Sequence, residues 1–389
     1  MDKPMVAGVP SKPQAEDAGR GANQGGAEWQ ANWRSTLAEM LRRVFQKTPN
    51  ERQIEVAEDL VRKEATAQQF IRRVMSMKSA TANHFVYTHT HSGHYYSPVV
   101  DTDLVGGYVK ANRTSGASGV PGVEMSLEAM EAFWRRNQKT IAETPFPNEK
   151  DDQHRYSFLG GPYGFGDGTT LRAMIADLRP KRIIEIGSGY STACMLDAAD
   201  EFGLDDLRIT CVEPFPARLK SVLKPGDMDR IEIIEQGVQG FSLARVAELE
   251  ANDILFIDST HVLKTGSDVH YELFYMLPAL KKGVVVHFHD CRWPMEYSDI
   301  QIFQKNYSWN EAYGVLAFLM YNSRFRVRFS GSFFAEHRAD LIGETFPAYL
   351  RNSGSALWLE VTADGQVLRE DGPMPERIPG AGASEGNVS

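Results

Sequence analysis

Residues 182–192 read RIIEIGSGYST, and this stretch decides the fold. Residues 182–186 are mostly branched and apolar, which is typical of a buried strand. Gly187 and Gly189 follow at once, where a backbone without side chains can turn tightly and approach a ligand closely. A helix is expected from Thr192, so that free N–H groups at its start would face the same crevice. A strand, a glycine turn and a helix in this order predict a ligand site at the end of the strand.

Helical and short apolar segments alternate around this stretch. Strands are expected at 182–186, 208–212, 231–234, 254–257, 284–288, 325–329 and 357–361. Helices are expected at 170–178, 192–201, 217–223, 243–249, 268–280 and 311–321. Single helices between strands predict right-handed crossovers and a parallel sheet, whereas the last two strands lack an expected helix between them and should pair antiparallel at one edge. The predicted fold class is α/β, a doubly wound and mostly parallel sheet of about seven strands.

The remaining chain divides by composition. Residues 1–27 and 365–389 are rich in Gly, Pro, Ala and polar side chains, so both are predicted to be disordered tails. Residues 28–80 have helical periodicity and are predicted to form an N-terminal helical appendage. Residues 81–154 are expected to form a capping loop and a helix that begins near Ser126, and the main domain is expected at 155–364.

The bulk properties exclude several classes of protein. The net charge of −9 and the absence of a long Lys/Arg run argue against a nucleic-acid partner. No secretory signal and no run of about 18 apolar residues is apparent, so the protein is expected in the cytoplasm without a membrane span. Cys194, Cys211 and Cys291 lack a metal-ligand spacing and are expected as buried thiols. A homo-oligomer is left open.

The residues around the glycine turn indicate which ligand binds there. A dinucleotide fingerprint requires a third glycine at position 192, where this chain has Thr192. Glu185, two residues before Gly187, suits a ligand with an ammonium group better than a pyrophosphate. Glu213 ends the second strand, where a carboxylate can accept both ribose hydroxyls. Gln239 follows the third strand, where an adenine edge would be read. These features favour S-adenosylmethionine.

Four motifs carry a more specific resemblance: IIEIGSGYST, VEP at 212–214, IDSTH at 257–261 and HDC at 289–291. They resemble motifs of class I S-adenosylmethionine-dependent methyltransferases with a Rossmann-like sheet, in particular the rhamnosyl and macrolide-sugar O-methyltransferases and the cephalosporin-hydroxylase-type proteins. The resemblance covers roughly residues 155–362. It implies that the cofactor is bound by Glu185, Gly187, Gly189, Tyr190, Ser191, Glu213, Gln239 and Asp258.

The resemblance also implies catalytic roles. Asp258 and Asp290 match metal-ligating aspartates, and His261 matches a general base. The residue before Asp290 is usually Glu in this family but is His289 here. Because Mg²⁺ prefers oxygen ligands, a site of Asp258, His289 and Asp290 would suit Mn²⁺, Fe²⁺ or Zn²⁺ better. The alternative is a site without a metal that relies on its histidines.

Two further segments are candidates for contact with the acceptor. Residues 292–308 form a long connection with Trp293, Met295, Tyr297 and Tyr307, which is interpreted either as a substrate lid or as a packed surface loop. The cluster His89, His91 and His94 is interpreted as part of a capping loop with Tyr95 or Tyr96 near the ligand, rather than as a separate metal site.

The leading hypothesis is therefore an O-methyltransferase that acts on a hydroxyl of a glycan or a glycosylated small molecule. Two alternatives remain open. One is a catalytically silent scaffold of a glycan-assembly system. The other is a non-haem iron oxygenase that uses His261, His289 and a carboxylate, although such triads usually lie in β-barrels.

Overall fold

The computed structural model describes residues 38, 54–55, 90, 92–112 and 120–367. The predicted appendage at 28–80, apart from single described positions, and the predicted tails, apart from 365–367, lie outside these residues, as do His89 and His91. The strands are β1 (Arg182–Ile186), β2 (Arg208–Val212), β3 (Ile231–Ile234), β4 (Ile254–Ile257), β5 (Val285–Phe288), β6 (Phe325–Ser330) and β7 (Leu357–Val361). The main helices are α4 (Thr102–Asn112), α5 (Leu127–Arg136), α6 (Gln138–Ala142), α7 (Phe165–Leu178), α8 (Tyr190–Glu201), α9 (Ala217–Val222), α10 (Leu243–Val246), α11 (Asp268–Tyr271), α12 (Leu277–Ala279), α13 (Glu311–Leu319), α14 (Gly331–His337) and α15 (Ala339–Thr345).

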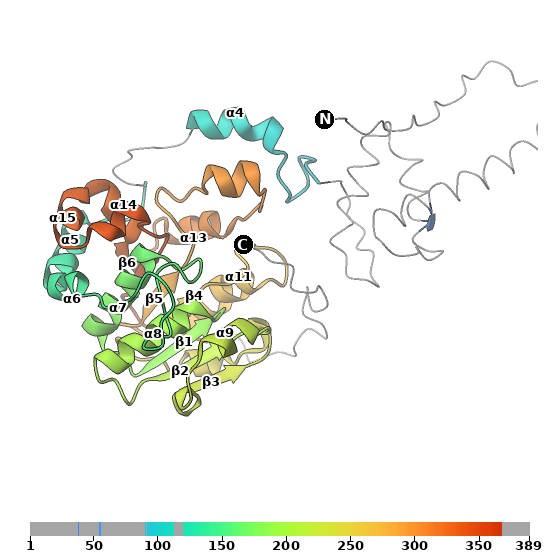
Figure 1. Cartoon of the computed structure of the whole chain (residues 1–389). Coiled ribbons are helices and arrows are strands. Elements are labelled where there is room, and N and C mark those ends of the chain that lie inside the picture. The colour runs from blue at the N-terminus through green and yellow to red at the C-terminus, as the bar shows by residue number, and fades with distance from the viewer. Residues whose placement is uncertain (1–37, 39–53, 56–89, 91, 113–119, 368–389) are drawn as a thin grey trace, which may run out of the picture. The chain divides into compact units, whose positions relative to one another are not determined.

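The strands form one seven-stranded sheet in the order β3-β2-β1-β4-β5-β7-β6 (Figure 1). Strands β1 to β5 are parallel to one another, as predicted. The strand order reverses between β1 and β4, because β1 pairs with β2 on one side and with β4 on the other. In an open parallel sheet this reversal leaves a crevice at the carboxyl ends of the strands, which is where ligands bind.

The antiparallel end of the sheet confirms the predicted pairing and corrects its connection. Strand β7 pairs antiparallel with both β5 and β6, so β6 forms the edge and β7 lies inside it. The two strands are joined by helices α14 and α15, whereas no helix was expected there. The chain 331–345 therefore leaves the sheet and returns beside β5, which a periodicity search for strands and single crossovers does not reveal.

The helix expected from Ser126 is part of this fold. Ser126 caps α5, because its Oγ accepts the N–H of Ala129 at 3.2 Å. Asn137 separates α5 from α6 and donates its side-chain amide to the Phe133 carbonyl. Trp134 of α5 is 1% exposed and packs edge-on against Tyr349. The described residues 107–112 and 120–367 group as one compact unit, and α5 packs there on β6 and α14.

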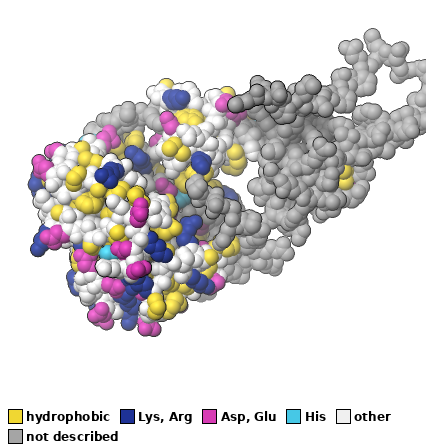
Figure 2. Space-filling view, in the orientation of Figure 1, with side chains coloured by type: hydrophobic (Ala, Val, Ile, Leu, Met, Phe, Trp, Pro, Cys, Tyr) yellow, Lys and Arg dark blue, Asp and Glu magenta, His cyan; other side chains and the backbone are white. Residues whose placement is uncertain are grey.

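The surface of the described chain carries charges of both signs. On the face shown in Figure 2, Lys and Arg side chains alternate with Asp and Glu side chains. Tyr95 and Tyr96, which were expected near the ligand, are 80% and 70% exposed. Among the described residues, no helix combines the length and the apolar character that a membrane span requires.

Candidate active site

The glycine turn between β1 and α8 packs directly against the end of β4. A Cβ added to Gly187 would lie 1.9 Å from the Asp258 carbonyl oxygen, and the residue has a φ of +78°. The Asp258 N–H donates to the Ile186 carbonyl at 2.9 Å, which extends the β1–β4 pairing by one residue. Gly187 is therefore required both by the backbone conformation and by the close approach of two strands.

A crevice opens above this turn at the carboxyl ends of β1, β2, β4 and β5. It is lined by Pro162, Tyr163, Gly187, Ser188, Gly189, Tyr190, Ser191, Glu213, Arg218, Asp258 and His289. Six of the eight residues predicted to bind the cofactor are in this set, and the structure adds the 162–163 segment, Ser188, Arg218 and His289. The segment is closely fitted, because a Cβ on Gly161 would lie 2.4 Å from the Tyr190 ring.

Glu185, expected to face a ligand ammonium, lies instead beneath the turn. It is 0% exposed, and both its carboxylate oxygens accept hydroxyl hydrogen bonds, from Ser191 (2.6 Å) and from Thr192. Thr192 in turn accepts the N–H of Gly189 at 3.1 Å. The residue that breaks the dinucleotide fingerprint thus holds the glycine turn to the start of α8. These contacts place Glu185 in support of the turn, and its direct contact with a ligand stays a prediction.

The other two predicted cofactor residues beyond the turn differ in position. Glu213 lines the crevice, and its carboxylate accepts N–H groups from Ser188 (3.2 Å) and Phe215 (2.7 Å). These bonds fix the side chain at the end of β2, where its remaining lone pairs can accept hydroxyl groups. Gln239 does not line the crevice, because its amide donates to the Gly266 carbonyl at 2.9 Å. Gln239 was predicted to bind the cofactor only because it follows β3. In the structure it lies in the turn at 238–240, and its side chain points to Gly266.

A cluster of imidazoles and carboxylates adjoins the crevice. His261 Nε2 lies 3.6 Å from Asp258 Oδ1 and 3.5 Å from Asp290 Oδ2. His289 Nδ1 lies 3.4 Å and 3.6 Å from the same two carboxylate oxygens. The structure thus brings together all four residues predicted for catalysis or metal binding. His261 and Asp290 both have left-handed backbones, with φ values of +62° and +55°. Such conformations in residues other than glycine are strained and concentrate at functional sites.

The charges in this cluster shift its ionisation. Burial lowers the pKa of His261, but Glu311 and then Asp258 and Asp290 outweigh it and raise the pKa above the ordinary value. Burial likewise opposes charge on His289, and Asp258 and Asp290 raise its pKa well above the usual range. Burial alone would raise the pKa of Asp290, yet His289 and His261 hold it below its ordinary range. The carboxylates therefore stabilise the protonated form of each imidazole relative to its neutral form, and the imidazoles stabilise the ionised form of Asp290.

Three residues that the sequence did not single out complete the cluster. Glu311, at the start of α13, contacts His261 Nδ1 at 2.7 Å. Ser355 donates its hydroxyl to Asp290 Oδ1 at 3.0 Å. Asp167 of α7 lies 3.6 Å from His289 Nε2 and accepts the N–H groups of the segment before β7. None of the three stands at the end of a parallel strand. That position was the sequence signal for Asp258, His261, His289 and Asp290.

The residues predicted to bind a metal are of suitable donor types, but their side chains are not arranged around a common point. Among the described residues, no group of three or more His, Cys, Asp and Glu side chains is arranged to hold a metal ion. His289 Nδ1 instead lies within ion-pair distance of both Asp258 and Asp290. Their mixed nitrogen and oxygen donors fit Mg²⁺ poorly, and they fit Mn²⁺, Fe²⁺ or Zn²⁺ by chemistry alone.

The connection 292–308 divides into a packed part and an exposed part. Trp293, Met295 and Tyr297 are 4–6% exposed and belong to the core, so they do not form an aromatic surface for an acceptor. Tyr307 is half-buried and stacks on Trp309, with ring centroids 4.4 Å apart. Trp309 in turn packs against the His261 ring, with ring centroids 4.3 Å apart. The aromatic pair beside the cluster is therefore Tyr307 and Trp309.

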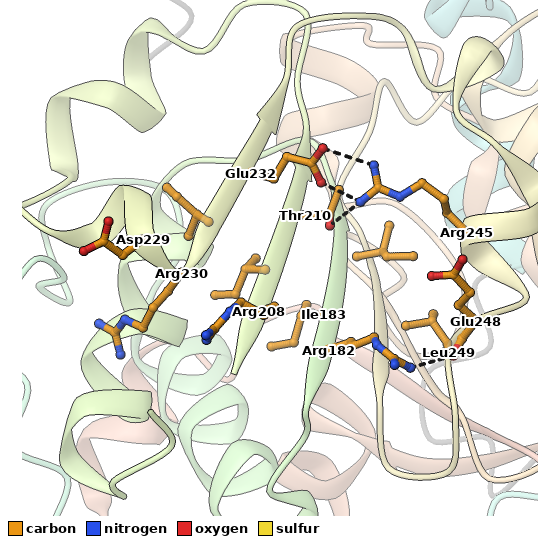
Figure 3. A pocket seen from close by; sticks show the side chains of 13 residues that line it. Arg182, Ile183, Arg208, Thr210, Asp229, Arg230, Glu232, Arg245, Glu248 and Leu249 are labelled. Atoms are coloured by element: carbon orange, nitrogen blue, oxygen red, sulfur yellow. Dashed lines mark hydrogen bonds and ion pairs between the residues drawn. The ribbon is translucent and has the colours of Figure 1, made fainter. Parts of the chain in front are cut away.

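A second hollow lies at the opposite end of the strands. It is bounded by the first residues of β1 and β2, by β3 and by α10 (Figure 3). Arg245 bonds to Glu232 and Thr210, and Arg182 donates to the Glu248 carbonyl. Arg182 and Arg245 are thus engaged within the chain, and none of the residues predicted for catalysis or for cofactor binding lines this hollow.

Comparison with known proteins identifies the class to which this geometry belongs. Residues 184–291, from β1 to the residue after Asp290, match the methyltransferase domain family. The chain contains a methyltransferase domain. This confirms the predicted enzyme class. An uncharacterized protein of Archaeoglobus fulgidus is 28% identical over 167 residues, which cover 42% of this chain and 74% of that protein.

Solved structures with a similar sheet include two methyltransferases. PaMTH1 of Podospora anserina, in its SAH-bound form, is 17% identical, with a TM-score of 0.34 over 67% of this chain and 95% of its own. The O-methyltransferase TomG of Streptomyces achromogenes, in complex with SAM, is 14% identical, with a TM-score of 0.34 over 67% and 96%. Similarity at this level does not extend to a ligand or a substrate of this chain.

The glycine turn yields a graded stability prediction. Gly187→Ala should lower the free energy of unfolding by about 2 kcal/mol or more. The new Cβ would lie on a residue with a left-handed φ and would also clash with the Asp258 backbone. Gly203→Ala, with a φ of +60° and open space around it, should cost about 1 kcal/mol from the backbone alone. Urea unfolding of the two variants measures this difference, and equal costs for Gly187 and Gly203 would contradict the clash.

The buried Glu185 predicts a pH dependence of stability. Burial, despite hydrogen bonds from Ser191 and Thr192, raises its pKa from 4.5 to about 7. The folded chain therefore binds this proton more tightly than the unfolded chain, and stability is lost as pH rises from about 4.5 through 7. Glu185→Gln removes this loss, so its stability relative to wild type should increase by about 2–3 kcal/mol between pH 5 and pH 8.

Denaturation at the two pH values measures this difference. Glu248→Gln, at an exposed position, is the control and should change stability equally at both. A pH-independent difference for Glu185→Gln would show that the Glu185 carboxyl ionises in the folded chain as it does in the unfolded one.

Proposed function

We propose that this methyltransferase domain transfers a methyl group from S-adenosylmethionine to a hydroxyl of a glycan or a glycosylated small molecule. One observation carries the proposal: Asp258 and His289 line the crevice and also belong to the cluster around His261. A ligand in the crevice would therefore lie close to a base in the cluster, because Asp258 and His289 belong to both. The saccharide acceptor rests on the resemblance of the sequence motifs to sugar O-methyltransferases.

The crevice offers matched groups to the parts of this ligand. S-adenosylmethionine supplies a methyl group on a positively charged sulfur. Gly187 and Gly189 allow close approach of the ligand to the backbone, and Ser188, Tyr190 and Ser191 border it. Glu213 is placed to accept ribose hydroxyls, and the carboxylate of Asp258 is placed to attract positive charge.

The cluster supplies proton transfer. A hydroxyl becomes a strong nucleophile as it loses its proton, and His261 Nε2 is the nitrogen that faces the crevice side of the cluster. In the proposed reaction, Nε2 takes the hydroxyl proton, the oxygen forms a bond to the methyl carbon, and the carbon–sulfur bond breaks to leave a neutral thioether. Asp258 and Asp290 stabilise the resulting imidazolium.

A divalent cation at Asp258, His289 and Asp290 is a secondary part of the proposal, supported only by donor chemistry. It would lower the pKa of an acceptor hydroxyl. Assays after EDTA treatment, with and without added Mn²⁺, test it. Loss and recovery of activity would support the ion. Unchanged activity would leave proton transfer to His261 alone.

Calorimetric titration tests the crevice first. We expect S-adenosylmethionine and S-adenosylhomocysteine to bind in the micromolar range and NAD not to bind. Glu213→Ala should weaken binding tenfold or more, about 1.4 kcal/mol, because it removes the ribose acceptor. Glu235→Ala, at an exposed carboxylate paired with Lys220, should leave the affinity unchanged. Absence of binding by both sulfur ligands would overturn the proposal.

Substitution of His261 separates binding from chemistry. His261→Asn should keep the affinity for S-adenosylmethionine and reduce kcat by about 10²- to 10⁴-fold, because the base is lost. His337→Asn, which changes a half-buried histidine of α14, is the matched control. Methyl transfer from labelled S-adenosylmethionine to a panel of glycosides with free hydroxyls provides the assay. Full activity of His261→Asn would remove this residue from the mechanism.

A further inference from the structure

The contact between His261 and the start of α13 is unusually well buried. Glu311 Oε2 lies 2.7 Å from His261 Nδ1, the shortest approach of any carboxylate to this imidazole. Glu311 is 2% exposed and His261 is 6% exposed. An ionic hydrogen bond of this length, shielded from water, is among the stronger polar interactions in proteins.

The same segment also holds the backbone of His261. The His261 carbonyl accepts the N–H groups of Asn310 (3.1 Å) and Glu311 (3.2 Å), which fixes a residue whose φ is +62°. The Asn310 side chain accepts the N–H of Leu263 at 2.6 Å and donates to its carbonyl at 3.2 Å. The Trp309 ring packs against the imidazole in a tilted orientation, with ring centroids 4.3 Å apart. Residues 309–311 therefore contact both the main chain and the ring of His261.

This arrangement decides which imidazole nitrogen is free. A carboxylate can only accept, so Nδ1 must carry the hydrogen in the contact with Glu311. In the neutral ring, Nε2 is then left without a hydrogen. Nε2 faces Asp258 and Asp290 at 3.5–3.6 Å, which is longer than a good hydrogen bond. The nitrogen on the crevice side is thereby kept as an acceptor.

Packing alone does not account for a carboxylate at this position. The second oxygen of Glu311, Oε1, is buried without a hydrogen-bond partner, and so is Oε1 of the fully buried Glu272 nearby. Burying a charge that is only partly compensated is costly, and an apolar side chain of similar volume would usually be no less stable. Within the described part of the chain, the bond to His261 is the hydrogen bond of the Glu311 carboxylate that offsets this cost.

We propose that Glu311 is the positioning residue of this active site, holding His261 in the ring orientation and tautomer that leave Nε2 free to take a proton from the acceptor. The proposal rests on the proposed function for its catalytic consequence, but the tautomer is a property of the chain itself. Glu311 does not touch the acceptor or the methyl donor, and it acts through His261.

Two substitutions of Glu311 test the proposal. Glu311→Met has a similar volume and no acceptor, and it removes a buried charge instead of creating one. Glu311→Gln keeps a neutral acceptor for Nδ1–H. We expect kcat to fall by between about tenfold and a hundredfold in Glu311→Met, with partial rescue in Glu311→Gln. The acceptor KM should change less than twofold, and S-adenosylmethionine affinity should be unchanged.

Long-range ¹H–¹⁵N spectra of the imidazole rings provide a readout that packing would not move. The signals of His261 are assigned by their loss in His261→Asn, and spectra are recorded at a pH where the ring is neutral. Wild type and Glu311→Gln should show a protonated Nδ1, and Glu311→Met should show a mixture of tautomers. Glu272→Gln controls for loss of a nearby buried carboxylate and should leave the tautomer of His261 as in wild type.

The outcomes separate this proposal from the proposed function. An unchanged His261 tautomer in Glu311→Met, or wild-type kcat in that variant, would overturn the positioning role. If the wild-type chain transfers no methyl group to any acceptor, the proposed function fails, and the spectra still decide whether Glu311 sets the tautomer.

Discussion

The site depends on the close approach of two strands at one backbone contact. Gly187 lies against the Asp258 carbonyl so tightly that any Cβ would collide with it. That contact sets the end of β1, which carries the glycine turn, beside the end of β4, which carries Asp258 and leads to His261. The crevice and the cluster of imidazoles and carboxylates are neighbours because these two strand ends are neighbours. The proposed function requires this closeness, because a ligand in the crevice and a base in the cluster must reach one molecule.

The price of this arrangement is a concentration of buried charge. Asp258, Asp290 and Glu311 surround His261, and Asp167 approaches His289 from the opposite side. Each imidazole is desolvated, yet the carboxylates hold its pKa above the ordinary value. The two kinds of group therefore stabilise one another, and removing a single partner would leave an uncompensated charge in a low-dielectric region. Left-handed backbones at His261 and Asp290 add local strain.

Much of this architecture could be predicted because its signals are local. Apolar runs of four to six residues located all seven strands, and the residues at their carboxyl ends included Asp258, His261, His289 and Asp290. The side-chain contacts of Glu185 and Gln239 were not apparent from the sequence. Glu185 precedes the glycine turn as expected, but its side chain lies under the turn, among the hydroxyls of α8. The side chain of Gln239 bonds to the Gly266 carbonyl after a short turn that follows β3.

The sequence by itself determined the parallel strands, the glycine turn and the chemistry available at the strand ends, because strand periodicity and glycine's conformational freedom act over a few neighbouring residues. Only the tertiary structure decided which side chains meet. Glu311 lies 50 residues from His261, and Ser355 lies 65 residues from Asp290. Asp167 reaches His289 from a helix before β1. Contacts over such separations depend on the crossing of helices over the sheet and on the insertion of β7 beside β5, which no local pattern encodes.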